Sequence, residues 1–131
     1  MSTGFLGSIG KLPYVAKNMY TDYEITLVLS TEGVNNWQPY STAGTDCYVY
    51  DYKPLVDFPN SGFTGSEYCE ILPRGVITET LINKYSWLNA VETTLIQQAD
   101  ESLLPVVRFY SFKGTPDADI PLTLRIWKSS I

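Results

Sequence analysis

Acidic side chains are the groups in this chain best able to do chemistry, because the sequence contains no histidine. Histidine is the usual general acid or base of enzymes, so Ser-His-Asp and Cys-His catalysis are excluded. A pair of carboxylates across a cleft, as in glycosidases, is the remaining option. The candidates are Asp46, Asp51, Asp57, Glu67 and Glu70. Acidic loop residues occur in any acidic protein, so we expect this chain not to be an enzyme.

Metal and cofactor ligands are also sparse. Asp117 and Asp119 lie two positions apart, where their carboxylates and loop carbonyl oxygens would suit Ca²⁺. The spacing falls short of a twelve-residue calcium loop, and an Asp in a turn commonly caps its own backbone. Cys47 and Cys69 form no Cys-x-x-Cys motif; we expect two buried thiols, with a disulfide between adjacent strands as the alternative. We predict no metal site and no cofactor.

Aromatic side chains are the informative group, with 10 Tyr, 5 Phe and 3 Trp. Tyr48, Tyr50 and Tyr52 occupy alternate positions and would line one face of a strand, with Val49 on the other face. Rings with hydroxyl groups are too polar for a dry core and too apolar for bare solvent. We therefore expect partial burial under a loop or contact with another subunit, and we assign these tyrosines to an interface.

A second aromatic group lies in a polar segment. Trp37 and Tyr40 follow Asn35 and Asn36, a composition typical of adaptable recognition loops. These four residues would form a carbohydrate- or ligand-binding surface. The alternative is that Trp37 fills one end of a β-sandwich.

The first 20 residues are rich in glycine and predict an extended N-terminal arm rather than a regular element. The arm carries Phe5, Leu6 and Ile9, apolar side chains that cannot form a core by themselves. Ordering such a segment is unfavourable unless its side chains become buried. We therefore predict that Phe5, Leu6 and Ile9 contact another subunit, and that residues 21–131 form a single domain.

Alternation of apolar and polar residues predicts the strands of that domain. We expect strands at residues 23–29, 47–52, 68–72, 106–112 and 120–127. The last two flank the turn sequence GTPDAD, which predicts an antiparallel hairpin. The polar segments 31–46 and 57–67 are predicted loops.

Residues 76–98 are ambiguous. Residues up to about Ile82 are β-formers and favour a strand. From residue 84 to 98 the evidence is divided: Tyr85, Leu88 and Val91 recur at helical spacing, whereas Thr93 and Thr94 favour a strand. We expect a helix there by a small margin.

Together these elements predict an all-β fold, or a mostly β fold with at most one short helix around residues 84–98. The architecture would be an antiparallel β-sandwich, jelly roll or barrel. A formal charge of −5 without a basic stripe argues against nucleic-acid binding. No long apolar run or basic amphipathic helix predicts membrane contact, and no signal peptide is evident, so we expect synthesis in a cytoplasm.

In length and general composition the chain resembles small β-sandwich proteins of virus particles, such as capsid, decoration or tail components of bacterial viruses. The glycine-rich arm, the tyrosine stripe, the low lysine content and the absence of catalytic groups carry this resemblance. It implies a non-enzymatic structural protein that assembles with itself or with other structural proteins, as a homo-oligomer or within a virus particle. The alternative is a carbohydrate- or ligand-binding module that uses Trp37 and Tyr40.

Overall fold

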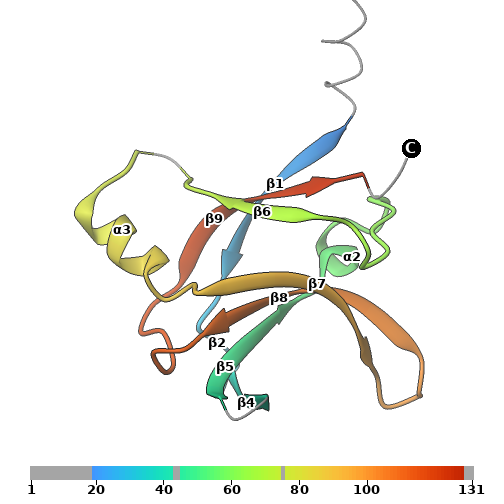
Figure 1. Cartoon of the computed structure of the whole chain (residues 1–131), viewed down its shortest axis with the longest axis horizontal. Helices are drawn as coiled ribbons and strands as arrows, with labels where there is room; N and C mark the ends of the chain where they lie inside the picture. Colours follow the sequence, from blue (N-terminus) through green and yellow to red (C-terminus); the bar gives the residue numbers. More distant parts are fainter. Residues whose placement is uncertain (1–18, 43–44, 75, 129–131) are drawn as a thin grey trace, which may run out of the picture.

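The computed structural model describes residues 19–42, 45–74 and 76–128, and it shows an all-β protein with two short helices. Three strands form one antiparallel sheet in the order β1-β9-β6: β1 (Tyr20–Leu27), β9 (Ile120–Trp127) and β6 (Cys69–Leu72). Four strands form the second sheet in the order β4-β5-β8-β7: β4 (Gln38–Thr42), β5 (Thr45–Tyr52), β8 (Leu103–Ser111) and β7 (Ala90–Gln97). The two sheets form separate layers of the molecule (Figure 1).

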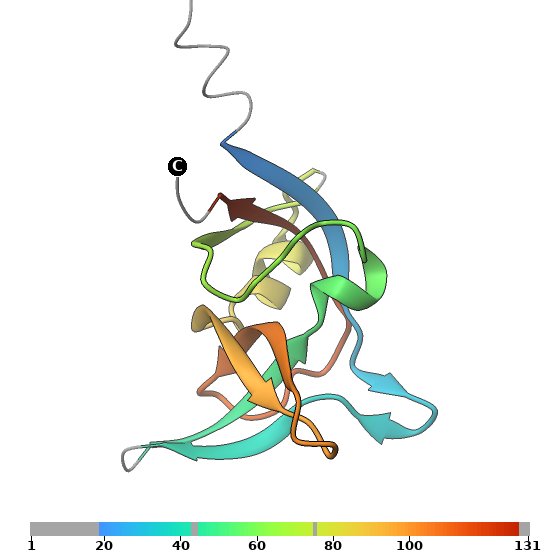
Figure 2. The ribbon, with the colours of Figure 1, turned by 90° about the vertical axis from the view of Figure 1, so that its right-hand side faces the viewer.

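The hydrophobic core lies between these sheets and draws residues from both. β9 supplies Leu122 and Leu124, which are fully buried, because alternate residues of a strand point to the same face. β8 faces them from the other sheet with Val107 and Phe109, which are also fully buried. The expected antiparallel sandwich-like architecture is therefore confirmed, and a second view shows the same layers edge-on (Figure 2).

The predicted hairpin between the last two strands is wrong. β8 pairs with β5 and β7, whereas β9 pairs with β1 and β6, so the segment between them crosses from one sheet to the other. Both strands are central in their sheets, and each buries one apolar face in the shared core. The turn sequence correctly predicted that two strands follow each other along the chain, but these strands do not pair with each other.

The segment 31–46, which was expected to be a loop, contains regular structure. A small hairpin, β2 (Ser30–Thr31) paired with β3 (Val34–Asn35), is followed by the edge strand β4. Pro39 interrupts the usual sequence signal for a strand, because proline has no backbone N–H. It lies at an edge, opposite Tyr48, where the sheet tolerates it.

The assignment of residues 76–98 is also corrected. Helix α3 (Glu79–Tyr85) begins where a strand was expected, and β7 occupies the part for which a helix was slightly favoured. The side chain of Thr78 accepts a hydrogen bond from the Leu81 N–H (3.2 Å) and so caps the helix. β7 follows the alternation of its β-branched residues, with Val91 and Thr93 more buried than Glu92.

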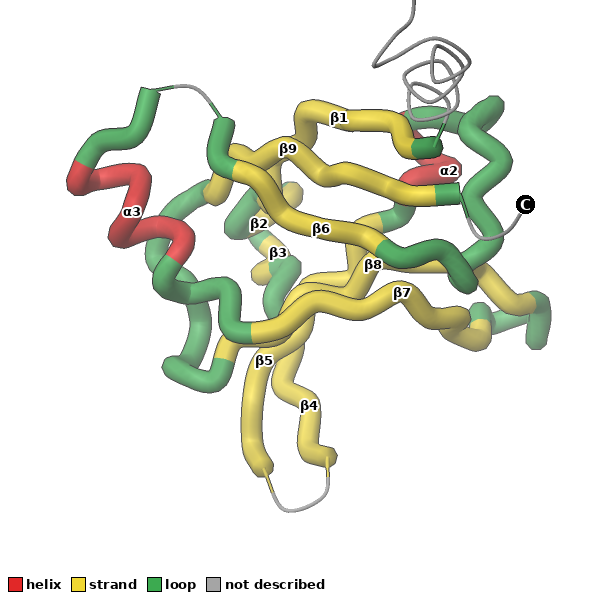
Figure 3. Tube along the Cα trace, turned by 45° about the horizontal axis from the view of Figure 1, so that its top comes forward, coloured by secondary structure: helices red, strands yellow, loops and turns green. Residues whose placement is uncertain are grey.

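The other helix, α2 (Pro54–Asp57), begins directly after β5, with proline in its first turn. α2 and α3 lie at opposite ends of the sandwich, as the tube view also shows (Figure 3). Among the described residues, no helix has the length and apolar character needed to span a membrane. The predicted arm, including Phe5, Leu6 and Ile9, lies outside the described residues up to residue 18.

Candidate functional site

The candidate site forms where β4 stops pairing with β5. β4 pairs with β5 only from Thr45 to Val49, whereas β8 continues to pair with β5 as far as Tyr52. Within the part of the chain that the structure describes, residues 50–52 therefore have a neighbouring strand on one side only. An unpaired strand edge presents backbone donors and acceptors that another strand can use.

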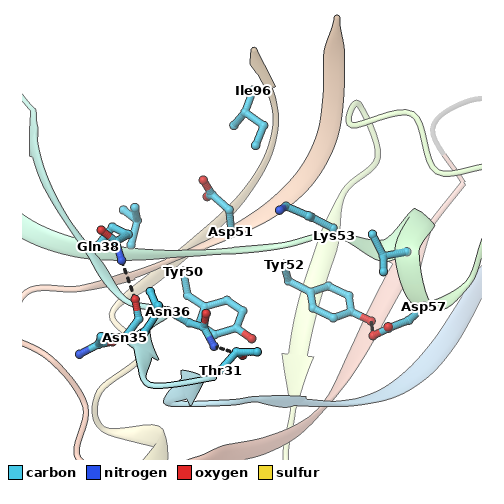
Figure 4. Close-up of a pocket in the computed structure, with 13 residues that line it drawn as sticks. Thr31, Asn35, Asn36, Gln38, Tyr50, Asp51, Tyr52, Lys53, Asp57 and Ile96 are labelled. Atoms are coloured by element: carbon cyan, nitrogen blue, oxygen red, sulfur yellow. Dashed lines mark hydrogen bonds between the residues drawn. The ribbon is translucent and has the colours of Figure 1, made fainter. Parts of the chain in front are cut away.

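The gap beside this edge is a cleft of about 620 Å³, which we call the edge cleft. One wall is residues 49–52 of β5 and Lys53 directly after it, and the opposite wall comes from the β2–β3 hairpin and the start of β4. Val56 and Asp57 of α2 line one end, and Ile96 of β7 reaches it across the sheet. Figure 4 shows Asp51 and Ile96 on one side of β5 and the ring of Tyr50 on the other.

The rim of the edge cleft is apolar and open to solvent. Val34 in the hairpin wall is 62% exposed, and Val56 in α2 is 70% exposed. Ile96 is partly buried, and these three aliphatic side chains come from three separate elements. Such a patch is poorly suited to bare solvent when it flanks a strand edge.

The charged side chains of the cleft have defined partners. Asp51 accepts two hydrogen bonds from Arg108, at 2.8 and 3.1 Å, and both side chains are largely buried. The Asp51 carboxylate raises the pKa of Arg108 further above its ordinary value, so this guanidinium remains charged. Asp57 accepts a hydrogen bond from the Tyr52 hydroxyl (2.8 Å), and Lys53 is exposed.

The three predicted interface tyrosines point to the inner face of β5. Tyr52 belongs to the core and is 7% exposed, whereas Tyr48 and Tyr50 pack partly buried against it. Tyr50 lies under the hairpin segment: its ring meets Trp37 edge-on at 5.4 Å, and its hydroxyl accepts a hydrogen bond from the Val28 N–H (3.3 Å). Tyr50 therefore has the first of the two arrangements expected for the tyrosines, partial burial under a loop, which requires no second subunit.

Val49, predicted on the face opposite the tyrosines, is 6% exposed and lies on the outer side of the sheet with Cys47. β5 is therefore covered on both faces, and the tyrosine face is the one that meets the core. The predicted alternation of the two faces is confirmed, and contact of the tyrosines with another subunit stays a prediction. The tyrosines are not carried into the interface proposed below.

The alternative ligand group does not form one surface. Trp37 is 2% exposed and belongs to the core, so its ring is not available for stacking on a ligand. Tyr40 lies on the outer face, 4.8 Å beneath the guanidinium of Arg108. Asn35 and Asn36 line the edge cleft, but their side chains support the hairpin: Asn35 accepts from the Trp37 N–H, and Asn36 donates to the Val28 carbonyl.

The remaining acidic candidates serve local structure. Glu67 is buried and accepts hydrogen bonds from three successive backbone N–H groups, those of Thr64, Gly65 and Ser66. Glu70 accepts from the Trp127 indole N–H (2.6 Å). Asp46 accepts from the Ser41 hydroxyl. Of the five carboxylates, only Asp51 and Asp57 line the edge cleft.

The calcium hypothesis gains no support from the described residues. Asp119 does not cap its own turn, because its carboxylate accepts a hydrogen bond from the Leu29 N–H (2.8 Å) in another segment. The residues that the structure describes contain no group of three or more metal-ligating side chains.

Cys47 and Cys69 are both buried and not bonded to each other, as expected for two thiols. They belong to different sheets, which rules out the alternative of a bridge between adjacent strands. Burial raises the pKa of the Cys69 thiol to about 11, so it stays protonated and poorly reactive at neutral pH.

Sequence reasoning missed the residues that shape the edge cleft. Val34 stands alone among polar or turn-forming neighbours, Val56 follows Pro54 and Leu55 where the predicted strand ends, and Lys53 looks like any surface lysine. The one sequence signal for an exposed apolar residue at this site was the Val-Asn-Asn-Trp stretch, in which Val34 directly follows a turn glycine.

Comparisons with known proteins assign no relative to the chain. No family model matches it, and no curated protein or solved structure does so.

Proposed function

We propose that this protein is a non-enzymatic structural component that acts through protein–protein contacts, and that the edge cleft binds an extended polypeptide segment. The observation that supports this most is the unpaired edge of β5 at residues 50–52, enclosed in a cleft with an apolar rim. Addition of a strand to a sheet edge is a recurrent mode of peptide recognition, in which backbone hydrogen bonds supply affinity and side-chain pockets supply specificity.

The composition of the cleft favours a polypeptide over a small polar ligand. The amide side chains of Asn35 and Asn36 are engaged within the hairpin, and Asp51 is engaged by Arg108. The most exposed groups are aliphatic, at Val34 and Val56. An extended segment with apolar side chains satisfies both the aliphatic rim and the backbone edge. Incorporation into a virus particle is the setting that the general resemblance suggests for such a component.

The rim valines provide a direct test. We expect the full chain to self-associate in light scattering after size exclusion, and Val34→Asp or Val56→Asp to weaken this association at least tenfold. A charge placed on an interface that becomes desolvated is unfavourable. Both positions are exposed in the single chain, so the unfolding midpoint should change little.

Val76→Asp is the matched control, because Val76 is 84% exposed and lies three residues before α3. α3 is at the opposite end of the sandwich from α2, which lines the cleft (Figure 1). Val76→Asp introduces the same charge and should leave association unchanged. The proposal is wrong if the chain remains monomeric at high concentration, or if all three variants associate as the natural chain does. Selective binding to glycans by a monomer would favour the alternative ligand-binding function.

A further inference from the structure

We propose that the occupant of the edge cleft is the N-terminal arm of a second copy of this chain, with residues 5–9 added as a strand beside β5. This inference rests on the proposed function and names the partner segment.

The backbone at the cleft is oriented to receive a strand. In an antiparallel ladder, alternate residues direct both their N–H and C=O groups to the same side. Pro39, which lacks an N–H, lies opposite Tyr48, so the residues of β5 that turn towards β4 are Cys47 and Val49. The next residue in this alternation is Asp51, two residues beyond Val49, which forms the last pair with β4. Its backbone groups therefore face the edge cleft.

The arm has the chemistry that this cleft requires. Within residues 5–9, Phe5 and Ile9 fall on one face of a strand, with Gly7 between them. Two apolar side chains on one face match the aliphatic rim at Val34 and Val56. An intervening glycine permits close approach to another backbone.

Charge also favours the arm as the occupant. Residues 1–18 contain Lys11 and Lys17 and no acidic residue, so all 14 acidic residues lie in the remaining chain, which has a net negative charge. Asp57 is exposed at the end of the cleft. A positive segment is therefore attracted to the domain as a whole, while at the cleft the exposed charges of Asp57 and Lys53 offset each other.

The direction of β1 favours a second copy over the same chain. The Met19 carbonyl accepts a hydrogen bond from the Lys128 N–H (2.8 Å), so the chain is still extended and paired with its neighbour at the entrance to β1. β1 then runs along the molecule towards the β2–β3 hairpin, whose residues line the cleft (Figure 2). Met19, where the arm joins the described chain, therefore lies at the end of β1 remote from the cleft, which favours the cleft of a neighbouring molecule as the arm's binding site.

Disulfide trapping between separately prepared full chains tests this arrangement. One preparation carries Ile9→Cys, and the other carries Val34→Cys, Val56→Cys or, as the control, Val76→Cys. Isotope labelling of one preparation identifies crosslinks between the two. We expect Ile9→Cys to crosslink to at least one of the two rim variants with a yield at least tenfold above that with Val76→Cys. A synthetic peptide of residues 2–13 should suppress this crosslink.

Equal yields with rim and control variants would overturn the inference. So would a chain carrying both Ile9→Cys and Val56→Cys that forms only an internal disulfide at dilution, because the arm would then fill its own cleft. If trapping fails while Val34→Asp and Val56→Asp still abolish association, the arm is not the occupant but the proposed function stands. If those rim substitutions are also silent, the function falls as well.

Discussion

Tyr52 shows how one buried hydroxyl links the core to the edge cleft. Its ring packs in the core while its hydroxyl donates to Asp57 at the cleft. Burial, reinforced by the neighbouring Asp57 carboxylate, raises the pKa of Tyr52 well above its ordinary value of 10.0. Burial also raises the pKa of Tyr110 to about 12, with a further contribution from its hydrogen bond to Glu92.

Tyr52→Phe should reduce the loss of stability at alkaline pH. Below pH 10 the tyrosine is neutral in both states, so its full contribution is present. Above pH 10 the unfolded chain loses the proton while the folded chain keeps it, so the free energy of unfolding falls by up to about 1.4 kcal/mol per pH unit. Urea unfolding from pH 8 to 11 should show a shallower decline for Tyr52→Phe, with a loss of about 1 kcal/mol at pH 8 from the missing hydrogen bond.

Tyr68→Phe is the matched control, because the Tyr68 side chain is 67% exposed. It should follow the natural chain across this range. If the free energy of unfolding falls equally with pH in Tyr52→Phe and in the natural chain, the buried Tyr52 hydroxyl does not cause the alkaline loss of stability.

At the scale of elements, the β2–β3 hairpin builds one wall of the edge cleft and is closed by a strained turn. Its two central residues, Glu32 and Gly33, have φ values of 52° and 82°. Positive φ at both positions is typical of a type I′ turn, which favours Asn-Gly. Glutamate pays a steric penalty there that glycine avoids.

Glu32→Asn should therefore stabilise the protein by about 0.5–1 kcal/mol, measured by thermal or urea unfolding. Asparagine tolerates positive φ better than glutamate does. Glu24→Asn removes the same charge from an exposed, extended position of β1, and it should give no gain because asparagine is disfavoured in strands. An equal gain from both substitutions would assign the effect to charge rather than to the turn.

At the scale of the whole molecule, β9 joins the two sheets through one buried face. Leu124 lies at its centre, fully buried, between Tyr23 of β1 and Ile71 of β6. Its side chain contributes to the core that β8 closes from the opposite sheet. The sandwich therefore depends on this strand more than on the hairpins at its periphery.

Leu124→Ala should lower the free energy of unfolding by about 2–5 kcal/mol, because it removes buried methyl groups and leaves a cavity. Leu103→Ala, at a residue that is 61% exposed, makes the same chemical change at the surface and should cost less than about 0.5 kcal/mol. Similar losses at the two positions, measured by denaturant unfolding, would show that the two sheets do not share the core described above.

Local pattern was sufficient for much of the fold. β9 was predicted with its observed limits, and β5 with its tyrosine alternation, because strict apolar–polar alternation is a property of neighbouring residues. The same reasoning failed for residues 76–98, where helical spacing and β-propensity gave opposing signals. It also failed for β4, where Pro39 is compatible with a strand only because that strand lies at an edge.

The sequence by itself determined the all-β class, most of the strands and the chain's lack of histidine chemistry, since these follow from composition and short-range order. Tertiary structure alone decided that β8 and β9 lie in different sheets, that the tyrosines face inward and that β4 leaves the edge of β5 unpaired. Strand pairing and the choice of buried face depend on contacts between distant residues. The edge cleft is a product of those contacts: Val34 and Val56 acquire a common role only when the β2–β3 hairpin and α2 are brought to opposite sides of one strand.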